Sequence, residues 1–260
     1  NNRIWNTEII EPNCVKFTLH SPDGDAGYPG NLEVAVTYTW DNDNNLTIEY
    51  DATSDAPTIV NLTNHSYFNL GGHNTGSLRA HKQLLKLNCS RWLRTNDNLI
   101  PTGEKVPVEG TVMDFRTPCE IGSRIFPAGE VPKTENLNTS FEAIKFGKGY
   151  DHCWLSDFYV APEDHKDALQ VIPEVAVLSD PESGRVLTIS TDQPGIQVYG
   201  GDWVGGCPAG KDGAVYDDYC AIALECQGCP DAINHPEFPS SEVTPDKPYH
   251  RTIIFSFSAE

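Results

Sequence analysis

Apolar residues at every second position are the feature that most constrains how this chain can fold. In residues 32–40 (LEVAVTYTW) apolar side chains alternate with polar or small ones, and the pattern recurs in residues 46–50 and at Ile253, Phe255 and Phe257. A period of two belongs to a β-strand with one buried face, whereas a helix would scatter the same side chains around its surface. The chain is therefore expected to consist largely of half-buried strands.

Short connections between these strands indicate an antiparallel arrangement. Residues 41–44 (DNDN) separate two alternating segments and predict a hairpin. Apolar stretches at 15–19, 186–189 and 196–199 predict further strands, and only residues 162–172 have a weakly helical pattern. Many strands without helical crossovers predict an all-β fold, an antiparallel β-sandwich formed by residues 1–260 as a single domain, and exclude a parallel α/β fold.

The charge of the chain argues against two classes of partner. Its 18 Lys and Arg residues against 37 Asp and Glu residues give a net charge of −19. Such a surface repels phosphate backbones and anionic lipids, and no stretch approaches the ~20 apolar residues of a membrane helix. We therefore expect a soluble protein that binds neither nucleic acid nor membranes. A neutral ligand such as a sugar is compatible with this charge.

The compartment and the assembly are indicated only weakly. The chain begins at Asn1 and its single methionine is Met113, so we expect its first residue to lie downstream of a translation start. Eight cysteines and five Asn-x-Ser/Thr sequons are compatible with secretion, but a chain of this size does not need disulfides. We expect a cytoplasmic protein, with secretion as the alternative, that is a monomer or a weak dimer.

Three segments place polar side chains in strand-like surroundings. Residues 61–70 read NLTNHSYFNL, so that His65 lies among amides, a hydroxyl and aromatic rings. Such a set supplies the donors, acceptors and stacking face of a sugar pocket, while the alternative is a core histidine satisfied by its asparagine neighbours. Residues 150–154 (YDHCW) put Asp151 beside aromatic rings, where it could accept bonds from sugar hydroxyls or simply occupy a turn.

Glu225 is the third candidate, because it lies near the end of the otherwise uncharged run AIALECQ at residues 221–227. Burial of a carboxylate costs several kcal/mol unless the group is used or paired. Glu225 is therefore either a poised general base or the partner of an arginine. Cys226 and Cys229 form a CxxC motif that has no second pair at zinc-ribbon spacing, so no metal site is expected.

Together, these segments resemble the galactose mutarotase (aldose 1-epimerase) family. Residues 61–70 are similar to the family's signature around its first acid–base histidine almost letter for letter. Further similarity extends over residues 5–257 and includes IPTG at 100–103, DFR at 114–116, SGR at 183–185, PGIQVY at 194–199 and PDA at 230–232. The resemblance implies an antiparallel β-supersandwich and a cofactor-free interconversion of the α and β anomers of hexoses such as galactose and glucose.

The resemblance also implies roles for individual residues. Glu225 stands where the family's base acts on the anomeric hydroxyl, and His65 stands where its acid protonates the ring oxygen. Asp151 matches a carboxylate that holds a sugar hydroxyl. The remaining expected contacts with the substrate come from residues near these two motifs, namely Asn64, Gln197 and Tyr199.

Two departures from the family pattern accompany the resemblance. The family's arginine after an asparagine and its second histidine before a glycine pair, both of which contact the sugar, are not found in this sequence. We expect that the chain lacks the N-terminal strands of the family domain and represents its C-terminal three-quarters, with a shortened homologue as the alternative. The cysteines at 226 and 229 are the second departure, and we expect structural thiols or a disulfide rather than a remodelled pocket wall.

Other functions are compatible with the same motifs. A catalytically silent sugar-binding homologue would keep the cleft without turnover, and a hexose-6-phosphate 1-epimerase would need a basic cluster for the phosphate. A glycosidase could use Glu225 and Asp151 as paired carboxylates. Aldose 1-epimerase activity on a small hexose is the leading prediction, because a binding protein gains nothing from a poised base.

Overall fold

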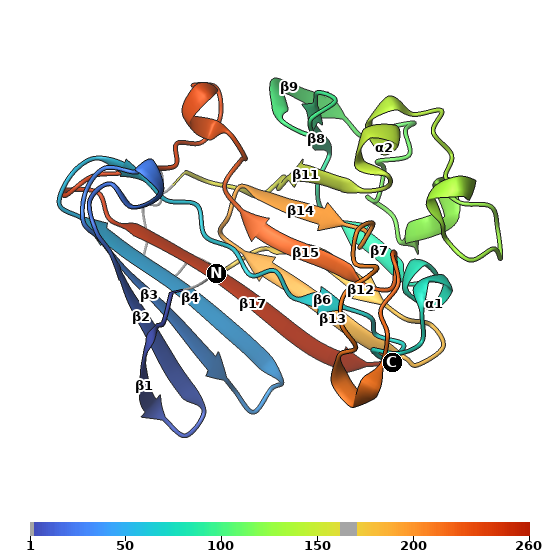
Figure 1. The fold of residues 1–260 in the computed structure, drawn as a ribbon, viewed down its shortest axis with the longest axis horizontal. Coiled ribbons are helices and arrows are strands. Elements are labelled where there is room, and N and C mark those ends of the chain that lie inside the picture. Colours follow the sequence, from blue (N-terminus) through green and yellow to red (C-terminus); the bar gives the residue numbers. More distant parts are fainter. Residues whose placement is uncertain (1–2, 162–170) are drawn as a thin grey trace.

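Two large antiparallel sheets make up most of the computed structural model, which describes residues 3–161 and 171–260 (Figure 1). The nine-stranded sheet contains, in spatial order, β1 (Asn6–Glu11), β2 (Cys14–Ser21), β3 (Leu32–Trp40), β4 (Asn45–Ser54), β17 (Tyr249–Ala259), β13 (Arg185–Thr191), β12 (Glu174–Ser179), β7 (Leu84–Leu87) and β10 (Cys119–Glu120). The six-stranded sheet contains β6 (Tyr67–Phe68), β15 (Ile222–Gln227), β14 (Gly195–Tyr199), β11 (Asp151–Leu155), β8 (Arg91–Thr95) and β9 (Pro101–Pro107). A small third sheet pairs β5 (Thr58–Ile59) with β16 (Glu242–Val243).

The predicted hairpin is present with the expected turn. Strands β3 and β4 pair from Leu32↔Ser54 to Trp40↔Leu46. Asp41 holds the turn between them, because its carboxylate accepts bonds from the backbone N–H of Asp43 (2.8 Å) and of Asn45 (2.9 Å). The alternation seen in the sequence is therefore the alternation of two strand faces, and the all-β antiparallel fold predicted from it is confirmed.

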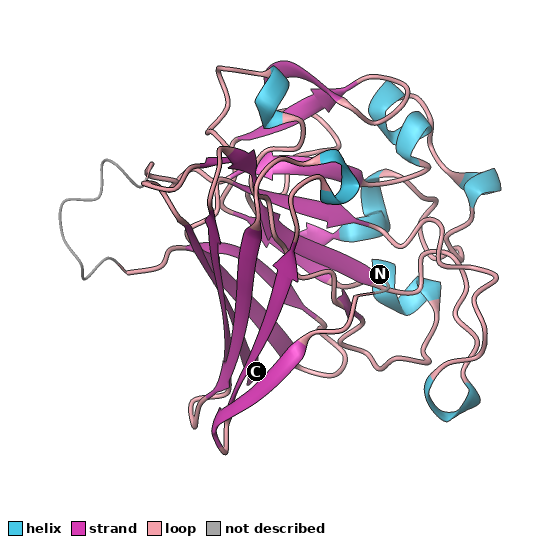
Figure 2. Ribbon diagram, turned by 60° about the vertical axis from the view of Figure 1, so that its left-hand side comes forward, coloured by secondary structure: helices cyan, strands magenta, loops and turns pink. Residues whose placement is uncertain are grey.

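Helices are few and short. The described residues contain α1 (Ser77–His81) and α2 (Glu142–Gly147), which lie toward the end of the molecule away from the β1–β2 hairpin (Figures 1 and 2). Single-turn 3-10 helices lie at Asp25–Gly27, Ile121–Arg124, Thr134–Asn136, Lys211–Gly213 and Ala232–Asn234. Sequence analysis missed both α-helices, because five or six residues are too few to show a 3.6-residue period. Residues 162–170 of the predicted helix 162–172 lie outside the described residues.

One core joins the two large sheets. It contains Ile48 and Phe255 from the nine-stranded sheet and Trp154, Ile196 and Leu224 from the six-stranded sheet. Because side chains alternate along a strand, the neighbours of Trp154, Ile196 and Leu224 point to the other face of the smaller sheet. That outer face carries the candidate site.

The part of the chain that the structure describes has no helix long and apolar enough to cross a membrane. All eight cysteines have free thiols, so the disulfide considered for Cys226 and Cys229 is not formed. Cys226 belongs to the main core, whereas Cys229 packs in a small second cluster with Leu93 and Cys153. Both thiols therefore fill apolar space, as the structural interpretation predicts.

Candidate active site

Three adjacent strands bring the acidic residues of the site together. In the ladder between β14 and β15, Gln197 lies directly opposite Glu225, and in the ladder between β11 and β14, Asp151 lies opposite Tyr199. Directly opposite residues share a face of the sheet. On this face the Gln197 side-chain amide donates a 2.7 Å hydrogen bond to the Asp151 carboxylate. Asp151, Gln197 and Glu225, from three strands, thus lie on one face of the smaller sheet.

His65 reaches the site from the segment between β5 and β6. Before His65, the Thr63 hydroxyl donates to the carbonyl of Cys226 in β15 (2.7 Å). After it, just beyond β6, the Asn69 amide donates to the carbonyl of Cys220, two residues before β15 (2.9 Å). These two bonds fix the backbone on both sides of His65. As a result, Nε2 of His65 lies 3.5 Å from Oε1 of Glu225. The polar side chains of the NLTNHSYFNL motif therefore serve to hold its histidine beside the glutamate.

The two members of this pair have different environments. The Glu225 side chain is 10% exposed, whereas that of His65 is 48% exposed. Burial raises the pKa of Glu225, and the nearby Asp151 adds to this effect while His65 opposes it. Burial likewise raises the pKa of Asp151, against the hydrogen bond from Gln197 and the charge of His65. A glutamate whose pKa is raised toward neutrality and a solvent-accessible imidazole are a suitable base and acid for proton transfer.

A cavity of about 300 Å³, which we call the Glu225 cavity, lies against these residues. Its volume is at the lower end of the roughly 300–1,000 Å³ of small-molecule sites. Polar and apolar groups line it from six separate parts of the chain, namely His65, Leu93, Thr95, Leu99, Pro101, Asp151, His152, Cys153, Gln197, Glu225, Gln227 and Pro230. This cavity has the mixture of carboxylate, amide, imidazole and apolar wall that a pyranose requires.

Aromatic rings flank the pair formed by His65 and Glu225. The His65 ring lies 4.9 Å from the ring of Tyr67 and 6.1 Å from the ring of Tyr199, which it meets edge to face. The Tyr199 hydroxyl accepts a bond from the backbone N–H of Trp203 (2.9 Å), and burial raises the pKa values of both tyrosines. Tyr67 was not among the predicted site residues, although its place two residues after His65 on a short strand could have indicated it.

The predicted site residues divide into two groups. His65, Asp151, Gln197 and Glu225 line the Glu225 cavity, and Tyr199 contacts the ring of His65. Asn64 does not line the cavity; its side-chain oxygen accepts a bond from the backbone N–H of Ser66 (3.1 Å). The lining residues of β8 and of the start of β9 were not predicted from the sequence, because nothing in the sequence of these strands shows that they lie beside β11.

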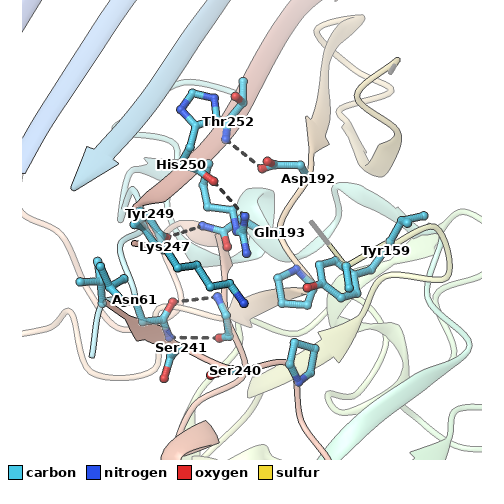
Figure 3. A pocket seen from close by; sticks show the side chains of 18 of the residues that line it. Asn61, Tyr159, Asp192, Gln193, Ser240, Ser241, Lys247, Tyr249, His250 and Thr252 are labelled. Atoms are coloured by element: carbon cyan, nitrogen blue, oxygen red, sulfur yellow. Dashed lines mark hydrogen bonds between the residues drawn. The ribbon is translucent and has the colours of Figure 1, made fainter. Parts of the chain in front are cut away.

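A second, larger cavity of about 540 Å³ is lined by a different set of residues (Figure 3). Asp192 lines it and accepts a 2.8 Å bond from the backbone N–H of Thr252, and Gln193 donates to the Tyr249 hydroxyl at 3.1 Å. Residues 159–161 and 171–173, which flank the undescribed residues 162–170, form part of its wall. His250 lines it and its imidazole lies 2.7 Å from the Asp51 carboxylate, but both of these side chains are more than half exposed, unlike Glu225. Size alone therefore does not make this cavity the candidate site.

Among residues 3–161 and 171–260, no three His, Cys, Asp or Glu side chains form a cluster that could hold a metal ion. The Glu225 carboxylate and the His65 imidazole together support proton transfer to and from a bound hydroxyl compound. The opening of a hemiacetal needs a base at the anomeric hydroxyl and an acid at the ring oxygen, the two oxygens that are bonded to the anomeric carbon.

Comparison with known proteins agrees with this geometry. Residues 1–256 match the family model described as aldose 1-epimerase. The chain belongs to the aldose 1-epimerase family. It is 37% identical over 258 residues to human galactose mutarotase, covering 98% of this chain and 66% of that protein. It is 38% identical over 237 residues to the aldose 1-epimerase of Haemophilus influenzae, covering 91% of this chain and 62% of that protein.

Solved structures of this family share the fold of the chain. An aldose epimerase homologue from C. elegans has a TM-score of 0.78 at 26% identity and covers 99% of this chain and 69% of its own. A galactose 1-epimerase from Lactobacillus acidophilus has a TM-score of 0.75 at 27% identity, with 99% and 67% covered. The galactose mutarotase-like architecture predicted from the sequence is thus confirmed. The chain spans just under two thirds of the length of the human and Haemophilus relatives.

Proposed function

We propose that this protein is an aldose 1-epimerase that interconverts the α and β anomers of hexoses such as galactose and glucose by acid–base ring opening and closure. The observation that carries the proposal is the 3.5 Å approach of the His65 imidazole to the buried Glu225 carboxylate, at a cavity that also contains Asp151 and Gln197. Family membership and the names of the relatives support the same activity.

The proposed reaction moves two protons and breaks one bond. The Glu225 carboxylate removes the proton of the anomeric hydroxyl, protonated His65 gives a proton to the ring oxygen, and the bond between C1 and that oxygen breaks to leave an open-chain aldehyde. Rotation about C1–C2 presents the other face of the aldehyde. On closure the ring hydroxyl attacks C1 and returns its proton to His65, while Glu225 returns a proton to the new anomeric oxygen. Both residues end as they began.

Binding and orientation of the sugar are assigned to the neighbours of this pair. Gln197 holds one oxygen of Asp151, so the carboxylate has lone pairs left for a sugar hydroxyl. Tyr199 offers an aromatic ring beside His65 on which an apolar face of a pyranose can stack. Asn64 remains a proposed contact of the same segment, one residue before the acid.

Two alternatives are separated by specific features of the cavity. The lining of the Glu225 cavity contains two carboxylates and no Lys or Arg, a setting that repels a phosphate ester and disfavours a hexose 6-phosphate as substrate. A silent sugar-binding protein has no use for a buried glutamate whose pKa is raised beside an imidazole. The epimerase proposal accounts for both observations.

Polarimetry on freshly dissolved α-D-galactose and α-D-glucose tests the proposal. Accelerated relaxation of the optical rotation is expected from the protein, a large loss from Glu225→Gln and a smaller loss from His65→Asn. The matched control is Asp192→Asn in the larger cavity, which removes a partly buried carboxylate elsewhere and should leave the rate unchanged. Sugar binding without acceleration would identify a binding protein, and loss of activity in Asp192→Asn would move the site to the other cavity.

Three further properties accompany the proposal. Eight free thiols suit a reducing compartment, so the cytoplasm is the proposed location. The shared core supports residues 1–260 acting as one domain, equivalent to the C-terminal three-quarters of the family domain. A monomer or weak dimer with a hexose as its partner is the proposed assembly, and size-exclusion chromatography with light scattering checks it.

A further inference from the structure

His152 is a second histidine in the lining of the Glu225 cavity, but its ring packs against two buried tryptophans. As the neighbour of Asp151 on β11, it points to the opposite side of the strand, toward the ring of Trp92 at 5.4 Å and that of Trp154 at 6.4 Å, both edge to face. The residue is fully buried, and burial lowers the pKa of His152 to about 3. The ring is therefore neutral at physiological pH and cannot serve as the acid of the reaction, a role that is left to His65.

The imidazole of His152 provides an acceptor for a backbone N–H that the sheet leaves unpaired. Strand β8 pairs with β11 only at Trp154 and Leu155, so its ladder does not reach Asp151. The backbone N–H of Asp151 instead donates to Nδ1 of His152 at 3.1 Å. A nitrogen that accepts a bond carries no proton, so the proton of this ring is on Nε2, which has no hydrogen-bond partner among the described residues.

The backbone at this point controls where the Asp151 carboxylate lies. Asp151 is the first residue of β11, and its side chain is held by one described hydrogen bond, from Gln197 to Oδ1. The end of α2 packs closely below: a Cβ added to Gly147 would lie 3.4 Å from Cε1 of His152 and 3.7 Å from Cβ of Asp151. The imidazole and the first residue of β11 thus lie beside the end of α2, and the bond from the Asp151 N–H to Nδ1 links the imidazole to the backbone that carries the carboxylate.

We propose that His152 is a positioning residue: its neutral ring accepts the N–H of Asp151 and thereby fixes the carboxylate that binds a hydroxyl of the sugar. The inference rests on the proposed function for the identity of the sugar. The contact between the imidazole and the backbone of Asp151 is independent of it.

Two substitutions separate positioning from packing. His152→Phe keeps a ring among the tryptophans but removes the acceptor, and His152→Asn places an amide oxygen close to the position of Nδ1. Loss of one hydrogen bond that orients a charged group predicts a rise in KM of about tenfold for His152→Phe, with kcat within about twofold, and a return to within about threefold of the original KM in His152→Asn. Leu187→Ala, a cavity-forming change in β13 of the other sheet, is the control that lowers stability without changing KM.

A spectroscopic test does not depend on activity. In the protein labelled with ¹⁵N-histidine, the signals lost in His152→Asn should show an unprotonated Nδ1 and a protonated Nε2 that do not titrate between about pH 5 and about pH 8. A protonated Nδ1, or titration in that range, would overturn the proposal. So would an unchanged KM in His152→Phe, a loss confined to kcat, or equal effects of the two substitutions.

The failure of the proposed function would be recognised separately. If the unaltered protein does not accelerate mutarotation, the dissociation constant of galactose measured by calorimetry replaces KM in the same comparison of variants. Binding of galactose that is tenfold weaker in His152→Phe, but close to that of the unaltered protein in His152→Asn, would then support the positioning role alone. No measurable binding of galactose or glucose by the unaltered protein would overturn both proposals, because Asp151 would have no sugar to hold.

Discussion

Replacement of Glu225 by Gln should make this protein less active and more stable at the same time. The amide keeps the shape of the side chain but cannot take a proton from the anomeric hydroxyl. A positioned general base contributes about 10²–10⁴ in rate, so a loss of about 3–5 kcal/mol of transition-state stabilisation is expected. The rate of mutarotation by polarimetry, measured above the spontaneous background, gives this loss directly.

The gain in stability has its origin in the burial of the carboxylate. The Glu225 side chain is 10% exposed, and burial raises its pKa above the ordinary value of 4.5. Below pH 4.5 the residue is protonated in both the folded and the unfolded chain. As the pH rises toward the folded-state pKa, the unfolded chain releases its proton first, so the folded state loses stability that a glutamine would retain.

The difference in stability between Glu225→Gln and the original protein should therefore grow as the pH rises above about 4.5, and it should level off once the pH exceeds the folded-state pKa of Glu225. A gain of only about 1 kcal/mol would raise the melting temperature by roughly 2–4 °C in a chain of this size, which scanning calorimetry resolves. Activity retained within tenfold would show that Glu225 is not the base. Loss of activity together with loss of stability would show that its carboxylate is structural, and the reasoning from burial would be wrong.

Three more predictions follow from the contacts of the described residues. Thr63→Val should reduce mutarotase activity and lower the free energy of unfolding by about 0.5–1.5 kcal/mol, since the bond from its hydroxyl to the carbonyl of Cys226 holds the segment that carries His65. The effects of Thr63→Val and His65→Asn on activity should be non-additive in a double-mutant cycle, and simple additivity would contradict the role of this bond. The value of kcat/KM should rise with pH through an acid limb centred above pH 4.5, because Glu225 must lose its proton to act and its pKa is raised; a limb at or below pH 4.5 would exclude it. Arg79→Leu should cost about 3–5 kcal/mol in urea unfolding, because it leaves the buried Asp180 carboxylate without the guanidinium 2.6 Å away, and a cost below about 1 kcal/mol would show that Asp180 is satisfied by its other partners.

The fold of the chain was largely predictable because its signals are local. Strand alternation in residues 32–40 reports which face is buried, and the DNDN turn reports where the chain reverses, since each depends on residues a few positions apart. The two short helices carry too little periodicity to be seen. The pairing of strand 249–259 with strands 45–54 and 185–191 joins distant parts of the sequence, and no local pattern encodes it.

For the candidate site, too, the local features were predictable from the sequence and the spatial arrangement was not. From the sequence alone, the residue types of the site were determined: a glutamate in an uncharged run, a histidine among amides, and an aspartate beside aromatic rings, each understandable from the cost of burying polar groups. Tertiary structure alone decided that Glu225 and His65 lie 3.5 Å apart and that Gln197 bonds Asp151. It also decided that the imidazole of His152 packs against two tryptophans while Asp151 lines the Glu225 cavity. These relations arise from strand register and from side chains such as Thr63 that attach one segment to the edge of another, and both require the sheet to be assembled before they exist.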